Sequence, residues 1–163
     1  ITQKEITSGA ISAENGNYMK ISEEITSANA VDVAKEILFS LDPRLRSQEL
    51  LMFCSQDFAD KYNEAYLMSH GGIPYNTQYN HTTVEGSNGR LKLVPLYNKA
   101  DSKFIHICPK SNMLVGYDQM GDLESIMVKE YEPFILTYIA TMFFGVQFET
   151  LDKRRFKTIE IPV

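Results

Sequence analysis

The sequence contains no tryptophan and only two cysteines, Cys54 and Cys108. Neither cysteine lies in a CxxC pair, so at most one disulfide could form, and this usage fits a reducing compartment. The two cysteines and three histidines are scattered, whereas structural zinc sites need paired ligands at short spacing. We therefore expect neither a disulfide framework nor a metal ion or other cofactor.

Basic residues are fewer than acidic ones: the sequence has 16 Lys and Arg against 21 Asp and Glu, which gives a net charge of −5 at pH 7. Nucleic-acid-binding surfaces are usually basic, so sequence-specific binding of nucleic acid is not expected. The longest apolar run, residues 134–148, is shorter than the ~20 residues of a membrane helix and contains three polar side chains. We expect no membrane segment. The polar start is not a signal peptide, and an opening at Ile1 instead of methionine suggests a fragment or a processed product.

A chain of 163 residues, 44% hydrophobic and 23% charged, suits one domain or two small lobes. Apolar residues recur every three or four positions over residues 28–41, which predicts an amphipathic helix with Ser27 as its N-cap. The run ELLMFCS, residues 49–55, predicts a strand buried on both faces. Ser55 then offers an N-cap to a second amphipathic helix over residues 56–68.

The second half of the sequence predicts strands. Residues 1–27 suggest an irregular or hairpin-like entry, and residues 72–90, rich in Asn, Thr, Gly and Tyr, form the longest expected loop. The run 134–148 is expected to be one long strand, because it is uncharged and rich in β-branched and aromatic residues. The other expected strands lie at 91–97, 102–109, 124–132 and 155–163, with a hairpin turn at 98–101 joining the first two. The pattern predicts an α+β fold, with helices segregated from a mostly antiparallel sheet.

One stretch, FIHICPKSNMLVGYDQMGD, places His106, Cys108 and Lys110 close together. Alternate strand residues point to the same face, so His106 could act as base for a Cys108 nucleophile in a small cytosolic enzyme. The alternative is a buried strand cysteine beside a hydrogen-bonded histidine. Cysteine is among the most often buried residue types, and no family-type signature surrounds Cys108, so we favour this second interpretation and expect no catalytic residue.

The aromatic content points to contact surfaces. Nine Tyr and nine Phe gather near the long loop and in the strands, and tyrosine is enriched at protein interfaces. A short basic run near the C-terminus could cap a strand end or pair with carboxylates of a neighbouring subunit. The candidate subunit-interface residues are Tyr75, Tyr79, Asn80, Arg154 and Arg155.

Several segments, taken in order, resemble the C-terminal half of tailed-phage major capsid proteins. The helix VDVAKEILFSLDPRLR is followed by the strand–helix unit LLMFCSQDFADKYNEAYL and by the strand GRLKLVPLY, where a loop re-enters the core. FIHICPKSNMLVGYDQM is similar to the family's next segment, and ESIMVKEYEPFILTYIATMFFGVQFETLDKRRFKTIEI to its closing strands. The resemblance covers about residues 28–161 and rests on the order and spacing of these segments.

The resemblance implies the two-lobed α+β fold of that family, with two or more helices packed on the sheet. The family's N-terminal arm, spine helix and extended loop are not visible ahead of Ile1, which fits an N-terminally truncated fragment. The implied parts are an entry segment at 1–27, an axial-domain-like lobe at 28–123, peripheral-domain-like strands at 124–149, and a closing strand at 150–163 that returns to the axial lobe.

The implied function is that of a structural subunit of a phage or prophage capsid, without catalytic activity or cofactor. Its partners would be copies of itself in capsomer rings, together with scaffold or other virion proteins. The genome would be enclosed without sequence-specific contacts, in a virion assembled in the cytoplasm of a bacterial host. An alternative with the same fold is an encapsulin-type nanocompartment shell, which encloses protein cargo.

Overall fold

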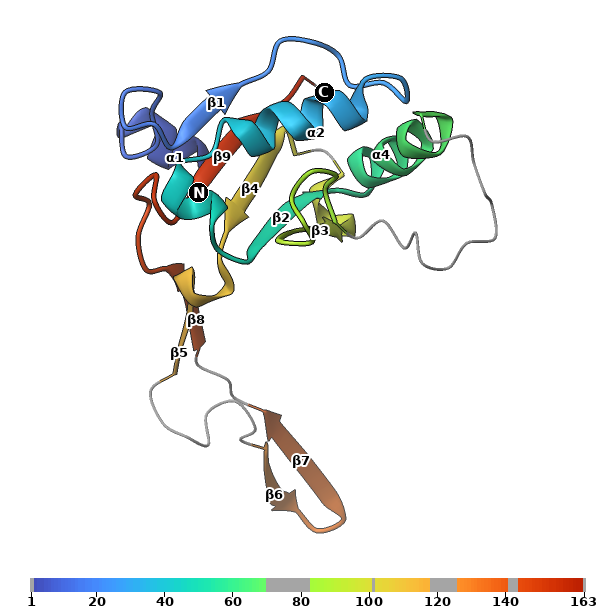
Figure 1. Ribbon diagram of the computed structural model, residues 1–163. Helices are drawn as coiled ribbons and strands as arrows, with labels where there is room; N and C mark the ends of the chain where they lie inside the picture. Colours follow the sequence, from blue (N-terminus) through green and yellow to red (C-terminus); the bar gives the residue numbers. More distant parts are fainter. Residues whose placement is uncertain (1, 70–82, 101, 118–125, 141–143, 163) are drawn as a thin grey trace. The chain divides into compact units, whose positions relative to one another are not determined.

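The computed structural model describes residues 2–69, 83–100, 102–117, 126–140 and 144–162 (Figure 1). The chain divides into two units, each described here by itself. Unit 1 comprises Ile1–Asn112 and Thr150–Val163, and unit 2 comprises Met113–Glu149. Unit 2 therefore begins at Met113, earlier than the boundary at 124 expected from the sequence. The assignment of the two units to the axial and peripheral lobes of a shell subunit stays a prediction.

Unit 1 is built on a five-stranded sheet with the order β1-β9-β4-β2-β3. Its strands are β1 (Tyr18–Lys20), β2 (Leu50–Ser55), β3 (Leu91–Leu96), β4 (Phe104–Cys108) and β9 (Lys157–Glu160). β4 pairs antiparallel with both β2 and β9, whereas β3 is parallel to β2 and β1 is parallel to β9. The α+β class is confirmed, but this sheet is mixed and not mostly antiparallel as predicted.

The hairpin predicted to join β3 and β4 through residues 98–101 is wrong. β3 and β4 are not neighbours, because β2 lies between them and pairs with both. The apolar strand β2 lies between β4 and the edge strand β3, so the chain leaving β3 must pass β2 to reach β4. A 3-10 turn, Tyr97–Lys99, begins that connection.

Two amphipathic helices cover one face of the sheet, as predicted. α2 (Ala30–Phe39) and α4 (Gln56–Ser69) contact each other and share one hydrophobic core with β2, β3, β4 and β9 (Figure 1). Its largest fully buried side chains include Ile37, Leu50, Met52, Phe58, Tyr62, Leu91, Ile105, Ile107 and Ile159. Strand β2 supplies the centre of this core and leads directly into α4.

The N-cap predicted for α4 is confirmed, whereas the N-cap predicted for α2 is wrong. Ser55 caps α4 as predicted, because its Oγ accepts a hydrogen bond from the backbone N–H of Phe58 at 3.2 Å. The predicted cap of α2 is wrong: Asn29 occupies the N-cap position, without a side-chain cap. The Ser27 hydroxyl instead donates to the carboxylate of Glu64 in α4.

The entry segment is more regular than predicted, with a short helix α1 (Thr2–Thr7) ahead of β1. A second short helix, α3 (Pro43–Arg46), follows α2. It starts with proline at a position where no backbone N–H is needed, and the Asp42 carboxylate accepts from the N–H of Arg44 at 2.9 Å.

Unit 2 consists of two antiparallel ribbons. β5 (Met113–Tyr117) pairs with β8 (Phe144–Phe148), and β6 (Ile126–Glu132) pairs with β7 (Ile135–Ala140). The single long strand predicted for residues 134–148 is therefore wrong. The run supplies two strands, β7 and β8, which belong to different ribbons and pair with different strands.

A buried asparagine in unit 1 holds the two points where the chain leaves for unit 2 and returns. Asn112 is fully buried, and its Nδ2 donates to the carbonyl oxygens of Thr150 at 3.0 Å and Arg155 at 3.2 Å. Its Oδ1 accepts from the N–H of Thr150 at 3.1 Å. Asn17 ties down the next residue in the same way, donating to the Leu151 carbonyl at 2.7 Å. We call Asn112 and its three hydrogen bonds the Asn112 clasp.

We expect Asn112→Asp to lower the free energy of unfolding by about 2–4 kcal/mol, because the new carboxylate loses both donors and faces two buried carbonyl oxygens. Urea unfolding measures this as a lower midpoint. Asn98→Asp, at an exposed asparagine, is the matched control and should change stability by less than about 0.5 kcal/mol. Equal midpoints for the two variants would contradict the role of the clasp.

Candidate subunit interface

The ribbon of β6 and β7 exposes apolar side chains on both of its faces. Met127 stands opposite Ile139 in the ladder, and Val128 stands opposite Tyr138. Opposite residues share a face and successive pairs alternate between faces, so these two pairs lie on opposite sides. All four side chains are exposed, from 43% for Ile139 to 69% for Tyr138. The ribbon therefore has no side covered by its own unit.

The ribbon of β5 and β8 also exposes large apolar side chains, here as two pairs that share one face. Val115 stands opposite Val146, and Tyr117 stands opposite Phe144. Each of these side chains is about half exposed or more. Both ribbons of unit 2 thus present large apolar side chains to solvent.

The turn between β6 and β7 carries the most exposed large hydrophobic side chain among the residues that the structure describes. Phe134 is fully exposed, and its backbone adopts a φ of +70°. This left-handed conformation is uncommon outside glycine and is an outlier for a bulky residue, at a cost of roughly 1–3 kcal/mol. The turn thus holds a phenylalanine at the tip of the ribbon despite an unfavourable backbone conformation.

Exposure of this kind favours association. A two-stranded ribbon is marginally stable in water, and burial of apolar surface contributes about 25 cal/mol per Å². Large apolar patches on a soluble chain mark surfaces that bind another protein. The strands of unit 2 are therefore the strongest candidate for a functional surface. Their exposed apolar side chains suit them to bind another protein surface.

The interface residues chosen from the sequence lie elsewhere. Tyr75, Tyr79 and Asn80 fall outside the described residues. Arg154 is exposed, in a turn where its backbone N–H bonds to Asp152, and Arg155 donates from Nη2 to the Ser111 hydroxyl at 3.2 Å. Their role between subunits stays a prediction.

The surroundings of Cys108 and His106 do not favour catalysis. Burial raises the pKa of the Cys108 thiol to about 11, so it stays protonated at neutral pH. Burial, with a smaller effect of Lys99, lowers the pKa of His106 to about 4. Both imidazole nitrogens form hydrogen bonds, Nδ1 with the Thr158 hydroxyl at 3.2 Å and Nε2 with the Thr2 hydroxyl at 3.3 Å. The histidine tethers α1 to the sheet and is not poised to deprotonate a thiol.

Within the described ranges, no group of three or more His, Cys, Asp or Glu side chains could hold a metal ion. None of the helices described is both long and apolar enough to cross a membrane.

The sequence did not reveal the exposed ribbons as a surface. The uncharged run 134–148 predicted a strand but not its exposure, because local composition does not distinguish burial within a chain from burial between chains. The available signal was the lack of alternation. In β7, ILTYIA, apolar residues occupy both faces, whereas a strand with one side in water alternates apolar and polar residues.

Comparison with known proteins gives little further information. No protein-family model and no curated protein matches the chain. One similar solved chain belongs to a structure described as "Satellite phage P4 procapsid including size determination (Sid) protein". The two chains share 17% identity with a TM-score of 0.47, and the match covers 90% of this chain and 47% of the other. This chain thus spans about half the length of that one. A likeness this weak carries no functional argument.

The environment of His106 predicts a loss of stability in mild acid. Its pKa is about 4 in the folded protein against 6.5 ordinarily, so the unfolded chain binds more protons between these values. Stability therefore falls as pH drops through this window, by roughly 2 kcal/mol between pH 7 and pH 5. His106→Gln removes the titrating group, and its urea midpoint should decline less over the same range. Parallel declines in the two proteins would contradict this assignment.

Proposed function

We propose that the chain is a structural subunit of a phage or prophage capsid, which assembles with copies of itself and has no catalytic role. The observation that carries this proposal is the exposure of apolar side chains on both faces of the β6–β7 ribbon. A ribbon uncovered on both sides is suited to contacts with neighbours on either side. Shell subunits need such repeated, modest interfaces, which close by symmetry.

The resemblance of residues 28–161 to tailed-phage major capsid proteins supports the same proposal. In its terms, unit 1 would be the axial-like lobe and unit 2 the peripheral-like lobe. Tyr75, Tyr79, Asn80, Arg154 and Arg155 would lie at contacts between neighbouring subunits. The net charge of −5 fits a wall that encloses a genome without reading its sequence. The subunit would assemble in the host cytoplasm, with scaffold or other virion proteins, and end in the virion capsid.

The proposal is tested by the assembly of the chain and of ribbon variants. We expect the purified protein to associate in a concentration-dependent way, seen by light scattering and by electron microscopy of the particles formed. Val128→Ser with Tyr138→Ser removes two apolar side chains from one face of the β6–β7 ribbon. Burial of each contributes roughly 1.5–3 kcal/mol, so association should weaken by about 100-fold or more.

A matched control removes exposed apolar side chains from unit 1. Leu67→Ser with Tyr97→Ser should leave association unchanged, since these residues lie outside the ribbons. A wild-type chain that stays monomeric at high concentration, or equal effects of the two double variants, would contradict the proposal. Particles that contain protein cargo and no nucleic acid would favour an encapsulin-type shell over a capsid.

A further inference from the structure

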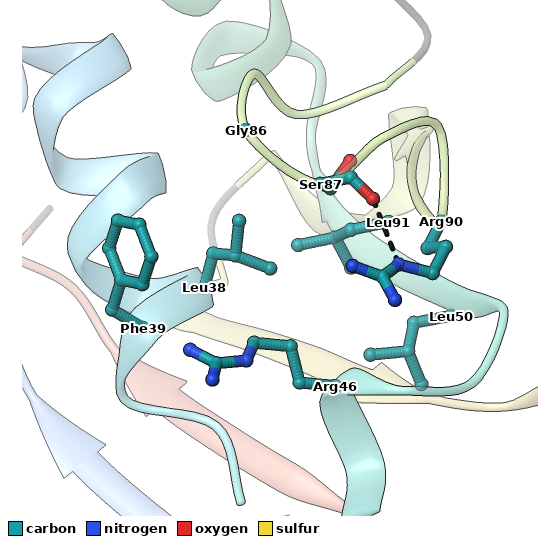
Figure 2. Close-up of a pocket in the computed structure, with 8 residues that line it drawn as sticks. All are labelled: Leu38, Phe39, Arg46, Leu50, Gly86, Ser87, Arg90 and Leu91. Carbon is teal, nitrogen blue, oxygen red and sulfur yellow. Dashed lines mark hydrogen bonds between the residues drawn. The ribbon is translucent and has the colours of Figure 1, made fainter. Parts of the chain in front are cut away.

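Unit 1 carries a pocket of about 230 Å³ at the edge of its core (Figure 2). The wall is formed by the end of α2, by α3, and by the first residues of β2 and β3 with the turn before β3. Pockets for small molecules usually measure roughly 300–1,000 Å³, so this one suits a single large side chain better than a cofactor. It is lined by Leu38, Phe39, Arg46, Leu50, Gly86, Ser87, Arg90 and Leu91.

The floor of the pocket is apolar. Leu38, Leu50 and Leu91 belong to the buried core, and Figure 2 shows their side chains among those that line the pocket. Phe39 stands at the rim and is 66% exposed. An apolar side chain entering from outside would therefore meet leucine below it and an aromatic ring beside it.

Two guanidinium groups flank this floor. Arg46 lies over the Phe39 ring, 5.8 Å from its centroid, and Arg90 donates from Nε to the Ser87 carbonyl at 3.1 Å. In the part of the chain that the structure describes, neither arginine has an acidic partner, and the nearby Glu85 pairs with Lys35 at 3.1 Å. Each guanidinium keeps N–H donors in a planar fork that matches a carboxylate. The pocket therefore fits an apolar side chain that is accompanied by negative charge.

The tip of the β6–β7 ribbon has that chemistry. Phe134 is fully exposed at the turn. Glu132 stands opposite Ile135 and Glu130 opposite Leu136, so two exposed carboxylates lie on the strand that leads into the turn of Phe134. Size, apolar character and charge thus match between the ribbon tip and the pocket.

We propose that the pocket of one copy receives the β6–β7 tip of a second copy. Phe134 would rest on the leucine floor, with Glu130 and Glu132 of the same tip pairing with Arg46 and Arg90. The inference rests on the proposed function as a self-assembling subunit and names one contact of that assembly. Tip and pocket are different surfaces, so each copy can offer its tip to one neighbour and its pocket to another. Such head-to-tail contacts generate rings when they close.

Photocrosslinking in the full chain tests this contact. We replace Phe134 with the photoreactive p-benzoylphenylalanine and mix the protein with ¹⁵N-labelled wild type before illumination. Mixed-isotope crosslinks are expected from position 134 to residues 38–50 or 86–91 of the other copy. The same photoreactive residue at Tyr97, an exposed aromatic of unit 1, is the control and should not label those segments. Crosslinks confined to one chain, or directed to other segments of the second copy, would overturn the proposal.

A charge exchange gives an independent readout. Arg46→Glu with Arg90→Glu, and separately Glu130→Arg with Glu132→Arg, should each weaken association by tenfold or more. An equimolar mixture of the two variants should recover it, since each provides the partner that the other has lost. Arg44→Glu, on the same short helix but outside the pocket lining, should have little effect.

The outcomes separate this contact from the broader function. If both charge variants assemble as the wild type does, or if the mixture shows no recovery, the contact is refuted while a self-assembling subunit stands. If the wild-type chain does not associate at all, both proposals are refuted.

Discussion

The hydrogen bonds of the buried Asn112 amide hold together the two points where the chain leaves unit 1 and returns to it. Its three hydrogen bonds join residue 112 to residues 150 and 155 inside a buried site. Unit 1 thereby holds both ends of the segment that forms unit 2. Both amide donors and the acceptor are used, so no other side chain of this size could make the same connections. Unit 1 thus contains both ends of the segment between these two points, and its own fold is closed by these bonds.

The two units differ in how far their apolar side chains are buried. In unit 1, one core of helix and strand residues is removed from water, as an independent domain requires. In unit 2, the strands pair in two ladders but leave many large apolar side chains exposed. Their stability therefore increases when another surface covers them, which couples the order of the ribbons to the concentration of partners. Such coupling suits a subunit that is needed only in an assembly.

Local pattern predicted the elements whose structure is decided locally. The spacing of apolar residues and the Ser55 cap were enough for α2, β2 and α4. The neighbours of each strand depend on the whole chain, so the hairpin at 98–101 and the single strand at 134–148 were wrong.

The exposed tip at Phe134 and the pocket of unit 1 could not be predicted from the sequence either. The positive φ of Phe134 has no signature in composition. The pocket depends on register, since the parallel pairing of Leu50 with Leu91 brings the segments that carry Arg46 and Arg90 to one edge of unit 1. No pattern in a single sequence links two arginines so far apart.

The Asn112 clasp also has a consequence for how such a chain can change. Because the departure and return of unit 2 are fixed by the same side chain, the segment between them is an insertion in the architectural sense. Closing a longer loop costs only about 0.6 kcal/mol for each doubling of its length, so unit 1 can tolerate insertions of very different size there. The ribbons can therefore diverge, lengthen or be exchanged between related chains while the body that carries them keeps its fold.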